Sequence, residues 1–225
     1  MSLKPPKKSD LNKSWMKKKP DRKFKIQPEY HLIVTEGTET EPAYFEVIKD
    51  IINRQYHERI RLDVFGEGYN TIRLFDKAKQ LAQNSPNVYR HVWVVYDTDD
   101  FPYEHIDKVV DLCKDNSGEE TTYHAIWSNQ CIELWFLLHF RFMQSDIHRS
   151  EYWDKLTECL TSIDAGTYEK NRKDMYEVLK PYMNIAIANA KRLDDINYGK
   201  MPSLAAPGTK IYELVEKLKP YLIEE

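Results

Sequence analysis

The chain has 225 residues and a net charge of −3, a length that suits one large domain or one domain with a helical appendage. Hydrophobic residues make up 41% of it and aromatic residues 12%, which excludes a chain disordered throughout; only 7 residues are glycine, which excludes a collagen-like repeat. The longest apolar run, 132–140, is too short to span a bilayer, and no apolar stretch follows the basic N-terminus. We therefore expect a soluble cytoplasmic protein without a signal peptide.

A basic segment, residues 1–28, opens the chain. Residues 1–25 hold ten Lys or Arg and two acids, which gives a net charge of +8. Because the whole chain has a net charge of −3, residues 26–225 have a net charge of −11. The segment is rich in Lys and Pro and lacks apolar periodicity, which predicts a flexible extended arm. Such an arm either contacts nucleic acid or is only a solubilising tail. The arm residues expected to bind substrate are Lys17, Lys18, Lys19, Arg22 and Lys23.

Strands and helices alternate after the arm. Apolar and β-branched runs predict strands at about 31–34, 60–64, 92–96 and 123–127. Apolar residues at helical spacing predict helices at about 42–52, 71–82, 106–113 and 131–140, with Pro42 in a first turn and Asn70 or Thr71 as a cap. This order predicts an α/β fold with a Rossmann-like parallel sheet and helices on both faces.

The pattern becomes helical after residue 140. Helices are predicted at about 150–162, 170–180, 182–194 and 209–219. We therefore expect three parts: the arm at 1–28, the α/β domain at 29–145, and a helical C-terminal region at 146–225 packed on that domain.

Acidic side chains follow two of the predicted strands. Glu36-Gly37 follows the first strand, and Asp97-Thr98-Asp99-Asp100 follows the third. In an open parallel sheet, ligands bind at the carboxyl ends of the strands, beside the topological switch point. If the first and third strands are neighbours, Glu36 faces Asp97 and Asp99 across that crevice.

Carboxylates gathered in this way need a physical reason. Without a partner they repel one another and raise each other's pKa, and a hard divalent cation removes that conflict. The sequence therefore predicts that Glu36, Asp97 and Asp99 bind Mg²⁺ or Mn²⁺. The same three residues are the predicted catalytic groups, and Gly37 permits close approach of the backbone to a phosphate. A second ion would be held with Glu41, Asp100 or Glu133.

Several of these residues have a second interpretation. Glu41 either supports the metal or stabilises a helix N-terminus, where the helix dipole favours an anion. Asp100 either extends the acidic cluster or caps a helix. Glu133 stands in an otherwise apolar helix, where a buried carboxylate is costly unless it is paired, so we favour a role at the site.

Other polar residues are ambiguous in the same way. Asn129 either caps the helix that follows or contacts substrate, and Lys170 is either a surface lysine or a phosphate ligand. His139 lies on an apolar face and is interpreted as a core histidine rather than a catalytic base. No Walker A loop, GxGxxG or Ser-His-Asp set is present. Cys113, Cys131 and Cys159 lack CxxC spacing and are interpreted as buried thiols in a reducing compartment.

Three segments together resemble the RloB-like proteins. They are Glu36-Gly37-x-x-Thr40-Glu41-Pro42-x-Tyr44-Phe45, Val94-x-Tyr96-Asp97-x-Asp99-Asp100-Phe101, and Ser128-Asn129-x-Cys131-x-Glu133-Leu134-Trp135-x-Leu137-Leu138-His139-Phe140. Tyr168-x-Lys170 and Pro207-x-Thr209 resemble later motifs, so the similarity spans roughly 30–220. The family usually has Pro where Gln130 stands, a difference that bears on the turn before the helix.

The resemblance implies a Toprim-type domain with a Glu after its first strand and a DxD after a later one. It also implies a metal-dependent nuclease that cleaves RNA or DNA in bacterial anti-phage defence by abortive infection. The expected partners are nucleic acid and an ATPase or another defence-system subunit, without a membrane. Two alternatives stay open: a nucleotidyl or phosphoryl transferase that uses the same metal site, and a non-enzymatic nucleic-acid-binding sensor.

Overall fold

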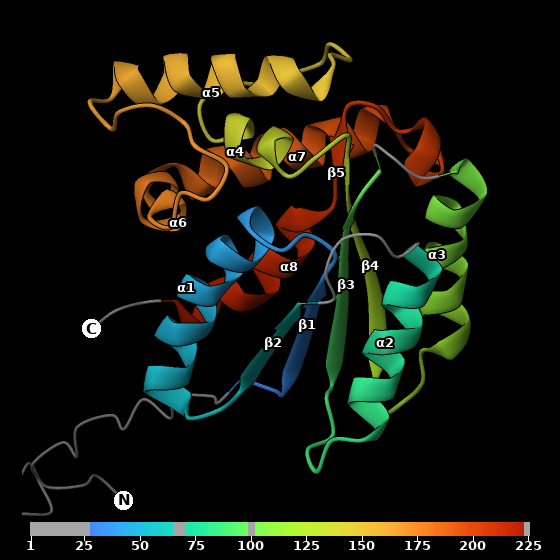
Figure 1. Cartoon of the computed structure of the whole chain (residues 1–225). Coiled ribbons are helices and arrows are strands. Elements are labelled where there is room, and N and C mark those ends of the chain that lie inside the picture. The colour runs from blue at the N-terminus through green and yellow to red at the C-terminus, as the bar shows by residue number, and fades with distance from the viewer. Residues whose placement is uncertain (1–27, 65–70, 99–101, 223–225) are drawn as a thin grey trace, which may run out of the picture.

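A five-stranded sheet organises the chain (Figure 1). The computed structural model describes residues 28–64, 71–98 and 102–222. Its strands, in the spatial order β2-β1-β3-β4-β5, are β1 (His31–Thr35), β2 (Ile60–Val64), β3 (His91–Asp97), β4 (Thr122–Asn129) and β5 (Gly208–Thr209). The first four are parallel, and β5 pairs antiparallel with β4. The predicted α/β fold is confirmed, and β1 and β3 are neighbours.

Helices cover both faces of this sheet (Figure 1). Helices α1 (Thr40–Tyr56) and α8 (Ile211–Leu218) lie on one face, and α2 (Thr71–Gln83) and α3 (Tyr103–Asn116) lie on the other. Side chains alternate along a strand, so Ile33 packs into the core under α1 and α8, whereas Leu32 and Val34 pack under α2 and α3. Burial on both faces explains why β1 is a continuous apolar run.

The C-terminal helices gather at one end of the sheet (Figure 1). They are α4 (Glu133–Leu138), α5 (Arg149–Ser162), α6 (Met175–Leu179) and α7 (Met183–Ile196), with 3-10 turns η2 (Lys180–Tyr182), η3 (Pro202–Leu204) and η4 (Lys219–Tyr221). Every residue of α4 is buried. One hydrophobic core joins these helices to the α1 face of the sheet, and Trp135 Nε1 donates a 3.1 Å hydrogen bond to the Tyr44 hydroxyl within it.

The helical half differs from the sequence prediction in three details. The helix expected at 131–140 is α-helical only over Glu133–Leu138, and the helix expected at 170–180 begins at Met175. Gly208–Thr209 forms an edge strand next to β4, where a helix was expected to begin at 209. A two-residue strand is too short to show a periodic pattern. Within the described ranges, no helix is both long and apolar enough to cross a membrane.

Candidate active site at the carboxyl ends of the strands

Glu36 lies in the turn that leaves β1. Its backbone N–H donates a 3.0 Å hydrogen bond to the Val95 carbonyl on β3, and the Thr35 hydroxyl donates a 3.2 Å bond to the Gly37 carbonyl. These bonds fix the turn against the end of the neighbouring strand. Burial, and then the charges of nearby groups that include Glu36, raise the pKa of Tyr96 on β3. The predicted acid therefore lies at the junction of β1 and β3.

Glu41 is brought to the same turn from the first turn of α1. Its side chain is buried, and a Cβ atom added to Gly37 would collide with its carboxylate. Because Gly37 has no side chain, the Glu41 carboxylate can occupy this space. This role is more specific than the close approach of the backbone to a phosphate that the sequence predicts. Glu41 lies in the first turn of α1, as the helix N-terminus interpretation expects, and its support of a metal ion stays a prediction.

Asp97 is the last residue of β3. The backbone N–H of the next residue, Thr98, lies 3.1 Å from the carbonyl oxygens of both Ser128 and Gln130, which fixes the strand end to β4. Asp99 and Asp100, the other acids predicted here, lie outside the described residues, so their metal-binding and capping roles stay predictions.

Glu133, the first residue of α4, and Asp97 both act on the thiol of Cys131. Burial raises the pKa of the Cys131 thiol, and the carboxylates of Glu133 and Asp97 raise it further, so both approach the same thiol. The Tyr168 hydroxyl donates a 2.7 Å hydrogen bond to Glu133 Oε1, and Glu133 is only 3% exposed. Glu133 is thus a paired, buried carboxylate rather than part of a solvated face.

The segment Tyr168–Lys170 is held at the start of α1. The Thr40 hydroxyl donates a 2.8 Å hydrogen bond to the backbone carbonyl of Lys170, whereas the Lys170 side chain is exposed. This arrangement agrees with the surface-lysine interpretation. A role for its ammonium group in phosphate binding stays a prediction.

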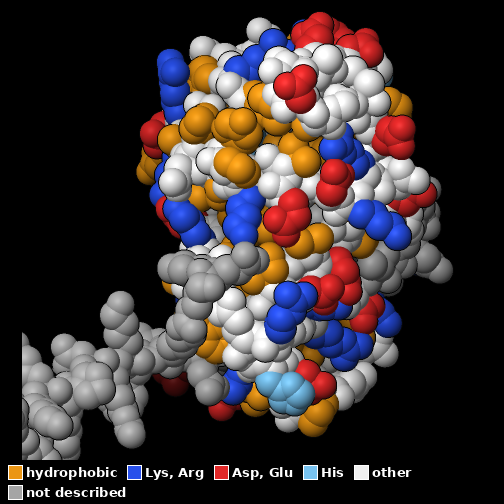
Figure 2. All heavy atoms as spheres, turned by 90° about the vertical axis from the view of Figure 1, so that its left-hand side faces the viewer, with side chains coloured by type: hydrophobic (Ala, Val, Ile, Leu, Met, Phe, Trp, Pro, Cys, Tyr) orange, Lys and Arg blue, Asp and Glu red, His pale blue; other side chains and the backbone are white. Residues whose placement is uncertain are grey.

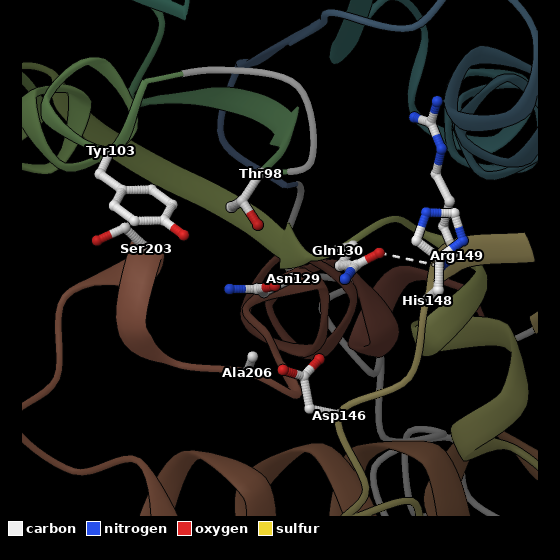
Figure 3. A pocket seen from close by; sticks show the side chains of 9 residues that line it. All are labelled: Thr98, Tyr103, Asn129, Gln130, Asp146, His148, Arg149, Ser203 and Ala206. Atoms are coloured by element: carbon white, nitrogen blue, oxygen red, sulfur yellow. Dashed lines mark hydrogen bonds between the residues drawn. The ribbon is translucent and has the colours of Figure 1, made fainter.

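A cavity of about 310 Å³ opens at the ends of β3 and β4, where Thr98, the residue after Asp97, lines it (Figure 3). Its lining includes Thr98 and Asn129, together with residues of the segments 146–149 and 203–206. This cavity could not be predicted from the sequence, because four segments far apart in the chain form it. The polar run Asp146-x-His148-Arg149, which leads into α5, is a local signal for it.

Asn129 is the last residue of β4 and does not cap α4. Its Nδ2 donates a 3.0 Å hydrogen bond to the Pro202 carbonyl, and α4 begins only at Glu133, so the capping interpretation is wrong. The Asn129–Gln130 peptide is cis. His139 is fully buried, with its Nδ1 2.9 Å from the Trp135 carbonyl oxygen, which confirms a core histidine.

The acids at this edge of the sheet are candidate ligands for a metal ion. Among residues 28–64, 71–98 and 102–222, no set of three or more His, Cys, Asp or Glu is placed to hold a metal ion. Glu36 and Asp97 nevertheless supply hard carboxylate oxygens, and Mg²⁺, which keeps several waters, needs only one or two protein carboxylates. The donors at this end of the sheet therefore fit a hard cation, and the metal site stays a prediction.

The distribution of charge on the described surface affects where a nucleic acid could bind. On the face shown in Figure 2, basic and acidic side chains are interspersed, without a continuous basic area among the residues drawn in colour. Binding of a polyanion would therefore depend on other surfaces or on the arm, whose residues Lys17–Lys19, Arg22 and Lys23 lie outside the described part of the chain.

Comparison with known proteins places the chain in a family. No curated protein and no solved structure matches it. The family model described as RloB-like protein matches residues 31–218, which cover the sheet, the acids at its carboxyl end and the C-terminal helices. The chain therefore belongs to the RloB-like protein family.

Proposed function

We propose that this RloB-like protein is a divalent-metal-dependent nuclease of Toprim type, which cleaves phosphodiester bonds in RNA or DNA during bacterial defence. The observation that carries the proposal is the position of Glu36 and Asp97 at the carboxyl ends of two neighbouring parallel strands, where the Glu36 backbone N–H is bonded to β3. This edge of a parallel sheet is where open α/β proteins bind their ligands.

Each acid would have a defined task. Glu36 and Asp97 would hold Mg²⁺ or Mn²⁺, together with Asp99, which the sequence alone predicts as a ligand. The bound ion would offset negative charge on the scissile phosphate. Glu36 would also transfer a proton at the attacking or the leaving oxygen, a contribution of about 10²–10⁴-fold to the rate. Glu41 would support the Glu36–Gly37 turn, and Glu133, held by Tyr168, would support the Asp97 side.

The experiment is a cleavage assay on transfer RNA, total RNA, plasmid and single-stranded DNA. The purified protein is incubated with Mg²⁺, with Mn²⁺ or with a chelator, and Asp97→Asn and Glu36→Gln are compared with Asp154→Asn, an exposed carboxylate outside the site. Metal-dependent cleavage that both site variants lose and the control retains supports the proposal. Cleavage that survives in both site variants contradicts it. Transfer of label from a nucleotide without strand cleavage would favour the transferase alternative.

A further inference from the structure

The cavity at the ends of β3 and β4 is lined by a buried hydroxyl group, that of Thr98. Thr98 is 7% exposed, and within the described part of the chain its Oγ1 has no hydrogen-bond partner. Figure 3 shows this hydroxyl directed into the cavity. A buried hydroxyl without a partner costs about 1–3 kcal/mol, so its placement points to a ligand that supplies the missing bond.

The other lining groups indicate what kind of ligand would fit. The Asn129 amide is held in place by the Pro202 carbonyl, and the Asp146 carboxylate points into the same space (Figure 3). Tyr103, 66% exposed, stands at the rim at the start of α3. The Arg149 guanidinium points away from the cavity (Figure 3). Because the Asp146 carboxylate points into the cavity and the Arg149 guanidinium points away from it, binding of a phosphate group there is disfavoured. The amide, hydroxyl and aromatic groups of the lining suit a nucleobase and its sugar.

We propose that this cavity binds one unpaired nucleoside unit of the substrate strand, next to the scissile phosphate, with Tyr103 stacking on its base. The proposal rests on the proposed function for its position, since Thr98 directly follows Asp97. In it, Thr98 and Asn129 hydrogen-bond to the nucleoside. Asp146 accepts a hydrogen bond from an exocyclic amino group, the pairing that acidic side chains make with cytosine.

The size of the cavity limits the ligand further. A volume of about 310 Å³ is at the lower end of the ~300–1,000 Å³ of ligand pockets, so it admits one nucleoside and excludes a base-paired duplex. Enzymes that read a single base in this way act on single strands or on nucleotides turned out of the duplex. The protein should therefore prefer unpaired nucleic acid, and the same chemistry can come from RNA or DNA.

Binding without catalysis tests the assignment. Short fluorescent single-stranded oligoribonucleotides and oligodeoxyribonucleotides, and matched duplexes, are titrated with the full-length protein in a chelator. The variants are Tyr103→Ala and Asp146→Asn. Their controls are Tyr198→Ala, 92% exposed and outside the cavity, and Asp154→Asn.

Tyr103→Ala should weaken single-strand binding by about 5- to 150-fold, the ratio that corresponds to stacking one base, and duplex binding by much less. An abasic residue, moved along the oligonucleotide, should at one position weaken wild-type binding and abolish the effect of Tyr103→Ala. Asp146→Asn should remove a preference for C, A and G, which carry an exocyclic amino group, over T and U. The two control variants should bind like the wild type.

Other results would overturn the assignment. They are equal binding by Tyr103→Ala and wild type, an equal loss on single strands and duplexes, or no single-strand binding by the wild type. Failure of the nuclease proposal would give a different result. In that case Tyr103→Ala would still weaken single-strand binding in the chelator, but the wild-type protein would cleave nothing with Mg²⁺ or Mn²⁺. A difference between the RNA and DNA series shows which sugar the cavity accepts.

Discussion

The hydroxyl of Tyr168 donates a 2.7 Å hydrogen bond to Oε1 of Glu133, deep in the core that joins α4 to the sheet. Burial, and then the adjacent Glu133 carboxylate, raise the pKa of Tyr168, so the hydroxyl keeps its proton at any physiological pH. The bond connects two segments 35 residues apart and holds a carboxylate that, like Asp97, raises the pKa of the Cys131 thiol.

Tyr168→Phe should lower the free energy of unfolding by about 1–3 kcal/mol, because it leaves a buried carboxylate oxygen without that donor. The measurement is urea denaturation at neutral pH, with Tyr198→Phe as the exposed control. Equal unfolding midpoints for Tyr168→Phe and wild type would mean that the bond does not stabilise the core.

Gly37→Ala should destabilise the protein by about 1–3 kcal/mol and impair the site, because the new methyl group collides with the Glu41 carboxylate. Adding Glu41→Ala removes the collision, so the double variant should regain part of the lost stability. Gly118→Ala is the control, since a Cβ atom there meets nothing within 4 Å. If Glu41→Ala gives no recovery in the Gly37→Ala background, Glu41 is not the group that Gly37 accommodates.

Three histidines form a cluster at the opposite, amino end of the strands. His91 Nδ1 lies 3.0 Å from His124 Nε2, and the rings of His31 and His91 stack with centroids 5.0 Å apart. Glu29 and Lys217 face this cluster, with Glu29 Oε2 3.0 Å from His91 Nε2. Burial, and then the neighbouring charges, lower the pKa of His31 to about 3 and that of His124 to about 4, and they also lower that of His91.

These lowered pKa values make stability depend on pH. As pH falls, the imidazoles of the unfolded chain bind protons while those of the folded chain stay neutral, which favours unfolding. The stability that the neutral histidines contribute is therefore complete above the ordinary histidine pKa of 6.5 and is lost as pH falls toward 4. His124→Asn should reduce the slope of stability against pH in that range by up to about 1.4 kcal/mol per pH unit. Denaturation at several pH values checks this, with the exposed His57→Asn as control. An unchanged slope in His124→Asn would contradict it.

Deleting residues 1–25, which carry a net charge of +8, should weaken nucleic-acid binding and flatten its salt dependence. Each phosphate contact contributes about 0.7 to the log–log slope on single strands and about 0.9 on duplex, so several contacts change it by several units. The melting temperature and cleavage at saturating substrate should not change. Coincident slopes for the full-length and truncated proteins would mean that the arm does not contact nucleic acid.

The sheet and its acidic edge were predictable from the sequence because each strand is a local pattern. Val92–Tyr96 is apolar throughout, as expected for a strand buried on both faces, and the strand-end rule then places Glu36 beside Asp97.

The parts that were not predictable depend on contacts between distant segments. The local pattern predicts a helix cap at Asn129, but this residue ends β4 and donates a hydrogen bond to Pro202, 73 residues further along the chain. The collision that keeps residue 37 a glycine involves a side chain on α1, and the cavity combines four separate segments. No periodicity within one segment carries such information.

The proposed function requires that Glu36 and Asp97 hold a divalent cation. Titration of the full-length protein with Mn²⁺, in which electron paramagnetic resonance measures the free ion, tests it without requiring activity. We expect saturable binding that weakens on the order of tenfold or more in both Glu36→Gln and Asp97→Asn, with unchanged binding in Asp154→Asn. Mn²⁺ binding of equal strength in all four proteins, or no saturable binding by the wild type, would mean that these two residues do not hold the ion.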